Sequence, residues 1–532
     1  MNAQIFADGR EGKLNTRVVA SGQVEVKKLT DWLSVTQPLP VSGVIPYQLQ
    51  LTLDGADSQL MVNSSLKGVA IDLPAPFGIT ADVGRDTTFR MTLQGAERRY
   101  WVNYGELANF TFAAPTGNFA EGRGELFLGN GDAVLPGAKG LRIRGVLSEL
   151  DVGPWQDLVS KYAGQDPGGS AKQLLSSADF KVGKLSALGT TLDQASVQLN
   201  RKPSAWALQL DSQQVKGSAS IPDAKAAPLV INLQYVRLPA PDPTVLADEN
   251  SPDPLASVDP TKIPALDITI NQVFQGNDLV GGWSLKIRPT AKGIAFNSLD
   301  MGLKGILLQG SGGWEGVPGA STSFFKGRAS GKNLADVLKG WGFAPSVTSK
   351  DFHMDVDGRW PGSPAWLATK RFSGTLDASL NEGQFVEVEG SAQALRVFGL
   401  LNFNSIGRRL RLDFSDLFGK GLSYDRVKGL LVATNGVYVT KEPIRLTGPS
   451  STIELDGTLN MVADQIDAKL LVTLPVTNNL PIAALIVGAP AIGGALFLID
   501  KLIGDRVARF ASVKYTVKGP WKEPKIAFDK AF

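Results

Sequence analysis

The chain has 532 residues, of which 43% are hydrophobic, 58 are glycine and 31 are proline, and this composition suits one long, turn-rich β structure as well as several ordinary domains. The formal net charge of +3 at pH 7 creates no large field to attract a polyanion, which makes nucleic acid a poor candidate partner. The absence of cysteine excludes disulfides, cysteine-ligated zinc and thiol nucleophiles.

Apolar and polar residues alternate strictly in many short segments. Leu49, Leu51 and Leu53 alternate with Gln50 and Thr52, which is the period of a half-buried strand. The pattern recurs at residues 89–93, 205–210, 230–236, 266–270, 283–287 and 452–456, with Gly, Asp or Asn between the repeats. About 25 to 30 such segments predict antiparallel β structure throughout the chain.

Short helical segments interrupt this pattern, and each contains a tryptophan. They lie at residues 29–32, 152–158 and 333–341. We expect each indole to fix a short helix on a core, because that role is far commoner for buried tryptophan than ligand binding.

Residues 239–264 contain seven prolines and five acidic residues, a composition that cannot form a strand or a regular helix. We therefore expect a mobile insertion, a Pro-rich acidic linker between two β stretches. The predicted organisation is a β segment at 1–238, the linker at 239–264, a second β segment at 265–390 and a C-terminal region at 391–532.

The residues that usually carry catalysis are scarce. His353 is the only histidine, and it lies in a strand-like alternation, so an exposed strand position is its simplest interpretation. Neither a nucleophile elbow nor a phosphate loop with correct spacing occurs. A carboxylate-only glycosidase stays open on the sequence, but we predict no enzyme activity, no catalytic residue, no metal site and no cofactor.

Residues 391–411 predict a basic amphipathic helix. Leu395, Phe398 and Leu401 share one side, while the arginines lie elsewhere. Such a helix either binds an anionic lipid surface or caps a sheet with solvated arginines. The candidate basic residues are Arg396, Arg408, Arg409 and Arg411.

A second C-terminal segment is apolar. Residues 480–499 contain no charge, and this length would suffice for a membrane span. Pro490 and the Gly493–Gly494 pair disfavour a continuous helix, and the strand-like residues 512–518 follow. The segment at 480–500 is therefore a membrane-dipping hairpin or interfacial helix, a helix buried against the sheet or plugging its end, or a true span. Its candidate membrane contacts are Leu485, Ile486, Leu496 and Phe497.

Several of these stretches resemble a known family. The similarity begins with the basic helix and its continuation to Tyr424 (SAQALRVFGLLNFNSIGRRLRLDFSDLFGKGLSY), and continues through residues 444–457 (IRLTGPSSTIELDG), 488–496 (GAPAIGGAL) and 515–521 (YTVKGPW). Upstream it is carried by residues 73–78 (LPAPFG) and 360–364 (WPGSP). In these motifs the chain resembles large envelope proteins of the AsmA-like superfamily, YhdP type.

The resemblance implies a fold and a function. It implies an elongated, curled antiparallel β-sheet that forms a hydrophobic groove, with a few short helices and C-terminal amphipathic and apolar helices. It implies intermembrane phospholipid transport through the periplasm toward the outer membrane, in support of the permeability barrier. The alternative is a structural or assembly factor for outer-membrane biogenesis without lipid conduction.

The resemblance also implies partners and a location. The partners would be phospholipids, the outer membrane at the C-terminal end and the inner membrane through an N-terminal anchor. Residues 1–10 contain no signal peptide or anchor, so we expect this chain to be the C-terminal part of a longer cell-envelope protein. The residues expected to line the groove are Leu49, Leu51, Leu53, Ile268, Ile270, Ile453 and Leu455.

Overall fold

The computed structural model describes residues 2–10, 13–32, 39–163, 174–187, 189–240, 251–386, 421–449, 451–475, 510–521 and 524–531. The chain divides into two compact units, Met1–Arg237 and Leu238–Phe532. Within the described residues there are 28 strands, three α-helices and five short 3-10 helices. The prediction of a mostly β protein is confirmed.

The first unit is built from consecutive strands. Strands β1–β4 and β6–β9 pair antiparallel with their neighbours along this series, β5 pairs with the start of β3, and β11–β15 continue in antiparallel order. The strands are β1 (Asn2–Arg10), β2 (Lys13–Glu25), β3 (Val41–Leu53), β4 (Gln59–Ser64), β5 (Val69–Ile71), β6 (Thr87–Thr92), β7 (Glu97–Tyr104), β8 (Ala108–Pro115), β9 (Arg123–Leu128), β10 (Gly140–Asp151), β11 (Leu175–Ala187), β12 (Thr190–Lys202), β13 (Ala205–Asp211), β14 (Val215–Pro222) and β15 (Leu229–Leu238).

One part of this sheet departs from the predicted antiparallel order. Strand β10 pairs parallel with both β9 and β11. Parallel neighbours need a crossover connection longer than a hairpin turn. Residues 129–139 supply it between β9 and β10, and the segment that contains helix α2 (Val152–Ala163) supplies it between β10 and β11.

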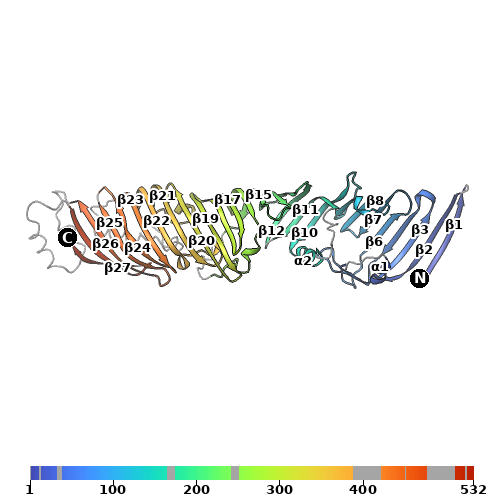
Figure 1. Ribbon diagram of the computed structural model, residues 1–532, viewed down its shortest axis with the longest axis horizontal. Helices are drawn as coiled ribbons and strands as arrows, with labels where there is room; N and C mark the ends of the chain where they lie inside the picture. Colours follow the sequence, from blue (N-terminus) through green and yellow to red (C-terminus); the bar gives the residue numbers. More distant parts are fainter. Residues whose placement is uncertain are drawn as a thin grey trace, which may run out of the picture. The chain divides into compact units, whose positions relative to one another are not determined.

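The second unit is antiparallel throughout the described strands. Each strand from β16 to β28 pairs with the next one in the chain, and Figure 1 labels most of them in this order, from β17 in green to β27 in dark red. Thirteen strands at about 4.8 Å spacing extend about 60 Å, so the sheet of this unit is long, as predicted. The strands are β16 (Leu266–Gln275), β17 (Asp278–Thr290), β18 (Gly293–Leu303), β19 (Ile306–Val317), β20 (Ala320–Gly331), β21 (Val347–Pro361), β22 (Ser373–Val386), β23 (Gly421–Thr434), β24 (Val437–Thr447), β25 (Thr452–Asn460), β26 (Gln465–Pro475), β27 (Phe510–Pro520) and β28 (Lys525–Ala531).

The three predicted short helices are confirmed as α1 (Val26–Trp32), α2 and α4 (Leu334–Gly340). Their tryptophans differ in role. Trp155 of α2 meets Phe77 edge-to-face at 5.8 Å between ring centroids, as expected of an indole that holds its helix on a core. The expectation is wrong for Trp32, which is 79% exposed because α1 buries Val26 instead.

The Pro-rich segment is partly ordered. Residues 251–264, which we call the strap, are held by Asp253, whose carboxylate accepts hydrogen bonds from the Ser363 amide at 2.7 Å and the Ser363 hydroxyl at 2.6 Å. The strap also contains a 3-10 turn at Pro260–Lys262 that Asp259 caps. The expected mobility is therefore wrong for this part, because side chains outside the linker bind it; residues 241–250 lie outside the described residues.

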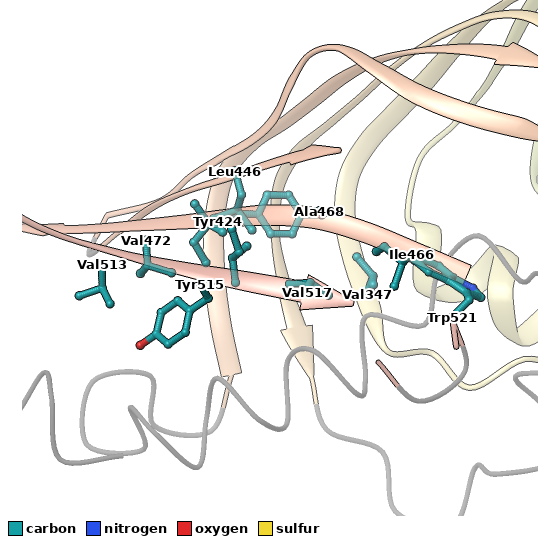
Figure 2. Packing of buried hydrophobic residues seen from close by; sticks show 12 residues of the cluster. Val347, Tyr424, Leu446, Ile466, Ala468, Val472, Val513, Tyr515, Val517 and Trp521 are labelled. Atoms are coloured by element: carbon teal, nitrogen blue, oxygen red, sulfur yellow. The ribbon is translucent and has the colours of Figure 1, made fainter. Parts of the chain in front are cut away.

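The largest buried cluster lies in the C-terminal strands of the second unit. It joins residues from β21 and β23–β27, and Figure 2 shows its side chains close together. Burial raises the pKa of Tyr424 to about 12, so its hydroxyl stays protonated and donates to the Thr348 carbonyl. The predicted helices at 391–411 and 480–500 lie outside the described residues. In the part that is described, no helix combines the length and apolar character needed to cross a bilayer.

Candidate functional site

One face of the first unit's sheet is apolar across successive strands. Residues paired directly across neighbouring strands point to the same face, so the register shows which side chains lie in one row. Strands β2–β4 and β6–β15 each contribute one apolar residue to an unbroken row. The row is Ala20, Leu49, Val62, Phe89, Val102, Phe110, Leu126, Ile143, Ala178, Leu199, Leu208, Ala219 and Ile231.

The second unit repeats this arrangement. One row crosses β16–β23 and contains only apolar residues and two glycines: Ile268, Leu285, Leu299, Gly310, Gly327, Val356, Leu376 and Leu431. A second row crosses β23–β27 as Val427, Leu446, Ile453, Val472 and Val513. We call these surfaces the apolar face of each unit.

The opposite face of each sheet is polar. In the second unit ion pairs join neighbouring strands on this face. Arg328 binds Asp355 through two hydrogen bonds of 2.7 Å, and Arg445 binds Glu454 through one of 2.9 Å. In the first unit Arg17 donates to Gln50 across β2 and β3. His353 also lies on this face, paired with Ser330 and Ser379. A sheet with one apolar and one charged face must cover the apolar face with something other than water.

The structure places the predicted groove residues on the apolar faces. Leu49 and Ile268 belong to the rows above, and the register puts the other predicted groove residues on the same side. Leu51 pairs with Val18 and Leu60, Leu53 with Thr16, Ile270 with Trp283, and Leu455 with Ile444 and Leu470. That they contact lipid stays a prediction. The membrane-contact residues and the four arginines lie outside the described residues.

Folded segments cover parts of the apolar faces. In the first unit Phe77 and Trp155 pack over Leu147, Val182 and Leu192. In the second unit the strap packs Val258 and Ile263 over Ile287, Ile294 and Trp314. The alternation in the sequence predicted which residues share the apolar face. It did not predict the segments that cover this face, because that packing depends on contacts between residues far apart in the chain.

Other parts of the apolar face are only half-buried. In β18–β21 they include Leu299, Met301, Leu308, Ala329 and Met354, none of which belongs to a buried cluster. In β3–β7 they include Leu49, Leu51, Leu60, Val62, Phe89, Met91 and Val102. Contiguous, partly exposed apolar rows of this kind are typical of surfaces that bind an apolar ligand.

A buried carboxylate lies between two arginines on the polar face of the first unit. Glu125 of β9 is fully buried and accepts hydrogen bonds from Arg142 at 2.6 Å, from Arg144 at 2.9 Å and from the Val134 amide at 3.0 Å. Burial alone would raise the pKa of Glu125, but these donors outweigh it and lower the pKa. The cluster joins β9 to its parallel neighbour β10, so its arrangement indicates a structural role.

Comparison with known proteins decides the family. The model of the YhdP protein family matches residues 1–526. The chain belongs to this family. The intermembrane phospholipid transporter YhdP of Escherichia coli (strain K12) is 24% identical over 219 residues, which cover 41% of this chain and 17% of that relative. No solved structure matches the chain. The predicted membership of a YhdP-type family is thus confirmed.

Proposed function

We propose that the apolar faces of both units conduct the acyl chains of glycerophospholipids between the two membranes of the cell envelope, with the C-terminal region toward the outer membrane. The observation that carries this proposal is the unbroken apolar row across β2–β4 and β6–β15. The YhdP relative is named as a phospholipid transporter, which supports the same ligand class.

The energetics explain why a continuous row matters. A diacyl phospholipid carries about 30 methylenes, and exposing each to water costs about 0.8 kcal/mol, so free transfer through water costs on the order of 25 kcal/mol. An apolar row with no polar interruption removes this cost at every step. A single charged residue in the row would restore part of the barrier, because the charge would need to stay hydrated.

The arrangement also explains where the rest of the lipid would travel. Acyl chains would lie against the apolar face, and the phosphate headgroup would stay at the sheet margin in water. The polar face, with its ion pairs such as Arg328–Asp355, would remain solvated throughout. This division needs no bond chemistry, in keeping with the prediction of a protein that is not an enzyme.

The experiment places a photo-crosslinking amino acid at single positions of the full chain. Leu51, Ile270 and Leu308 test the apolar faces, and their neighbours Gln50, Thr269 and Gln309 on the polar face serve as matched controls. Each variant is purified from cells grown with radioactive phosphate and irradiated. We expect labelled lipid on the first three variants and none on the controls.

The alternative function predicts a different result. A packed structural or assembly factor would leave all six positions free of lipid adducts. Equal labelling on both faces would indicate adsorption to the surface and would also contradict conduction along the apolar face. Adducts confined to the apolar face are the result that only the proposed function predicts.

A further inference from the structure

Aromatic rings on the apolar faces lie over glycines of the neighbouring strand. Phe352 of β21 is paired with Gly331 of β20, and a Cβ atom placed on Gly331 would lie 2.6 Å from the Phe352 Cζ atom. Opposed Cβ positions in a sheet are about 5 Å apart, so a ring tip this close to its partner must lean along the sheet. The ring of Phe352 therefore lies down on the sheet instead of standing away from it.

The same contact recurs along both apolar faces. Tyr47 covers Gly22 in the first unit. A Cβ atom placed on Gly22 would lie 2.9 Å from the Tyr47 hydroxyl oxygen and 3.1 Å from Tyr47 Cζ. Phe325 of β20 covers Gly310 of β19 in the second unit, with Cε2 at 2.8 Å from such an atom. Glycine is needed at each position because any side chain would occupy the place of the ring.

We propose that these glycines are positioning residues for lipid passage, because they keep bulky aromatic side chains low and leave room above the apolar face for acyl chains. This inference rests on the proposed function. Aromatic rings supply a large apolar contact area, but rings that stood upright would sterically block the movement of acyl chains along the face. A ring that lies flat supplies the area without the obstruction.

The test substitution is Gly331→Ala in the full chain. The new methyl group must displace the Phe352 ring, which then rises from the sheet, and we expect severalfold less lipid crosslinked at Leu308 and severalfold slower transfer of phospholipid between vesicles. Removing the ring in Gly331→Ala/Phe352→Ala should restore both. A fluorine label on Phe352 reports by NMR whether the ring moves in the single variant.

The polar face contains a matched control. Gly313 of β19 is paired with Phe324 of β20, and a Cβ there would lie 2.5 Å from Phe324 Cζ and 2.8 Å from the Ile294 carbonyl oxygen. The corresponding distances at Gly331 are 2.6 Å to Phe352 Cζ and 2.7 Å to the Gly305 carbonyl oxygen. Gly313→Ala should therefore reduce the melting temperature about as much as Gly331→Ala, without reducing lipid transfer.

The outcomes separate this inference from the proposed function. If wild-type chain crosslinks lipid but Gly331→Ala transfers it normally, or if Gly313→Ala is equally impaired, the inference is overturned and the proposed function stands. If wild-type chain carries no lipid, both are overturned. Should Gly331→Ala fail to fold, Gly22→Ala gives the same test more gently, since the three atoms nearest to its new methyl all belong to Tyr47.

Discussion

Glu125 shows how a single residue supports the unusual parallel strands of the first unit. Its carboxylate has no exposed surface, whereas the side chains of Arg142 and Arg144 remain 35% and 38% exposed. Leaving these arginines without their acceptor is costly, but solvent screens part of the cost. We expect Glu125→Gln to lower the free energy of unfolding by about 2 kcal/mol, measured by urea denaturation.

The pH dependence of this variant gives an independent check. Because the pKa of Glu125 is lowered in the folded protein, its contribution to stability is present above the ordinary glutamate pKa and is lost as the pH falls through the lower folded value. Acid should therefore destabilise wild-type chain more than Glu125→Gln. Glu121→Gln is the control, since the Lys139–Glu121 pair is more than half exposed and should contribute little. Equal effects of the two substitutions would contradict the structural role of Glu125.

At the scale of elements, the strap shows how a segment without regular structure becomes ordered. Burial alone would raise the pKa of Asp253, but hydrogen bonds from the Ser363 hydroxyl and from the Leu255 and Ser363 amides outweigh it and lower the pKa. The anchoring is therefore present at neutral pH and is lost as the pH falls below the ordinary range of aspartate. The strap packs on the apolar face, so its release would uncover Trp314.

We expect Asp253→Ala to loosen the strap without unfolding the sheet. A charged hydrogen-bonded anchor contributes about 2 kcal/mol, so amide exchange at Val258 and Lys262 should accelerate about thirtyfold. Hydrogen exchange followed by mass spectrometry measures this, and lowering the pH of wild-type chain should reduce the protection factors of the same amides, once the slower chemical exchange in acid is corrected for. Asp300→Ala is the control, because Asp300 accepts from Gln309 on the polar face. Unchanged exchange in Asp253→Ala would show that apolar packing alone holds the strap.

At the scale of the whole molecule, the order in which strands pair determines how far the destabilising effect of a local substitution extends. Each strand from β16 to β28 pairs only with its neighbours in the chain among the described strands, so stability in this unit resembles that of a repeat protein with nearest-neighbour coupling. A local defect should then loosen adjacent strands and leave distant ones intact.

Val517→Ala tests this property. Val517 has no exposed surface, and the truncation should cost about 2 kcal/mol through lost contacts and the cavity left behind. We expect faster amide exchange in β25–β28 and unchanged exchange in β16–β18. Uniform acceleration across the unit would instead show that all thirteen strands unfold as one cooperative block.

The sequence alone determined which residues share a face and where short helices interrupt the strands. Leu49 and Leu51 fall on one side of β3 because alternation is a local property with a period of two residues. Only the tertiary structure decided that β10 is parallel to its neighbours, that the strap packs on Trp314 and that Phe352 lies on Gly331. These features depend on contacts between residues far apart in the chain, and no local pattern of side chains encodes which distant segment will supply the partner.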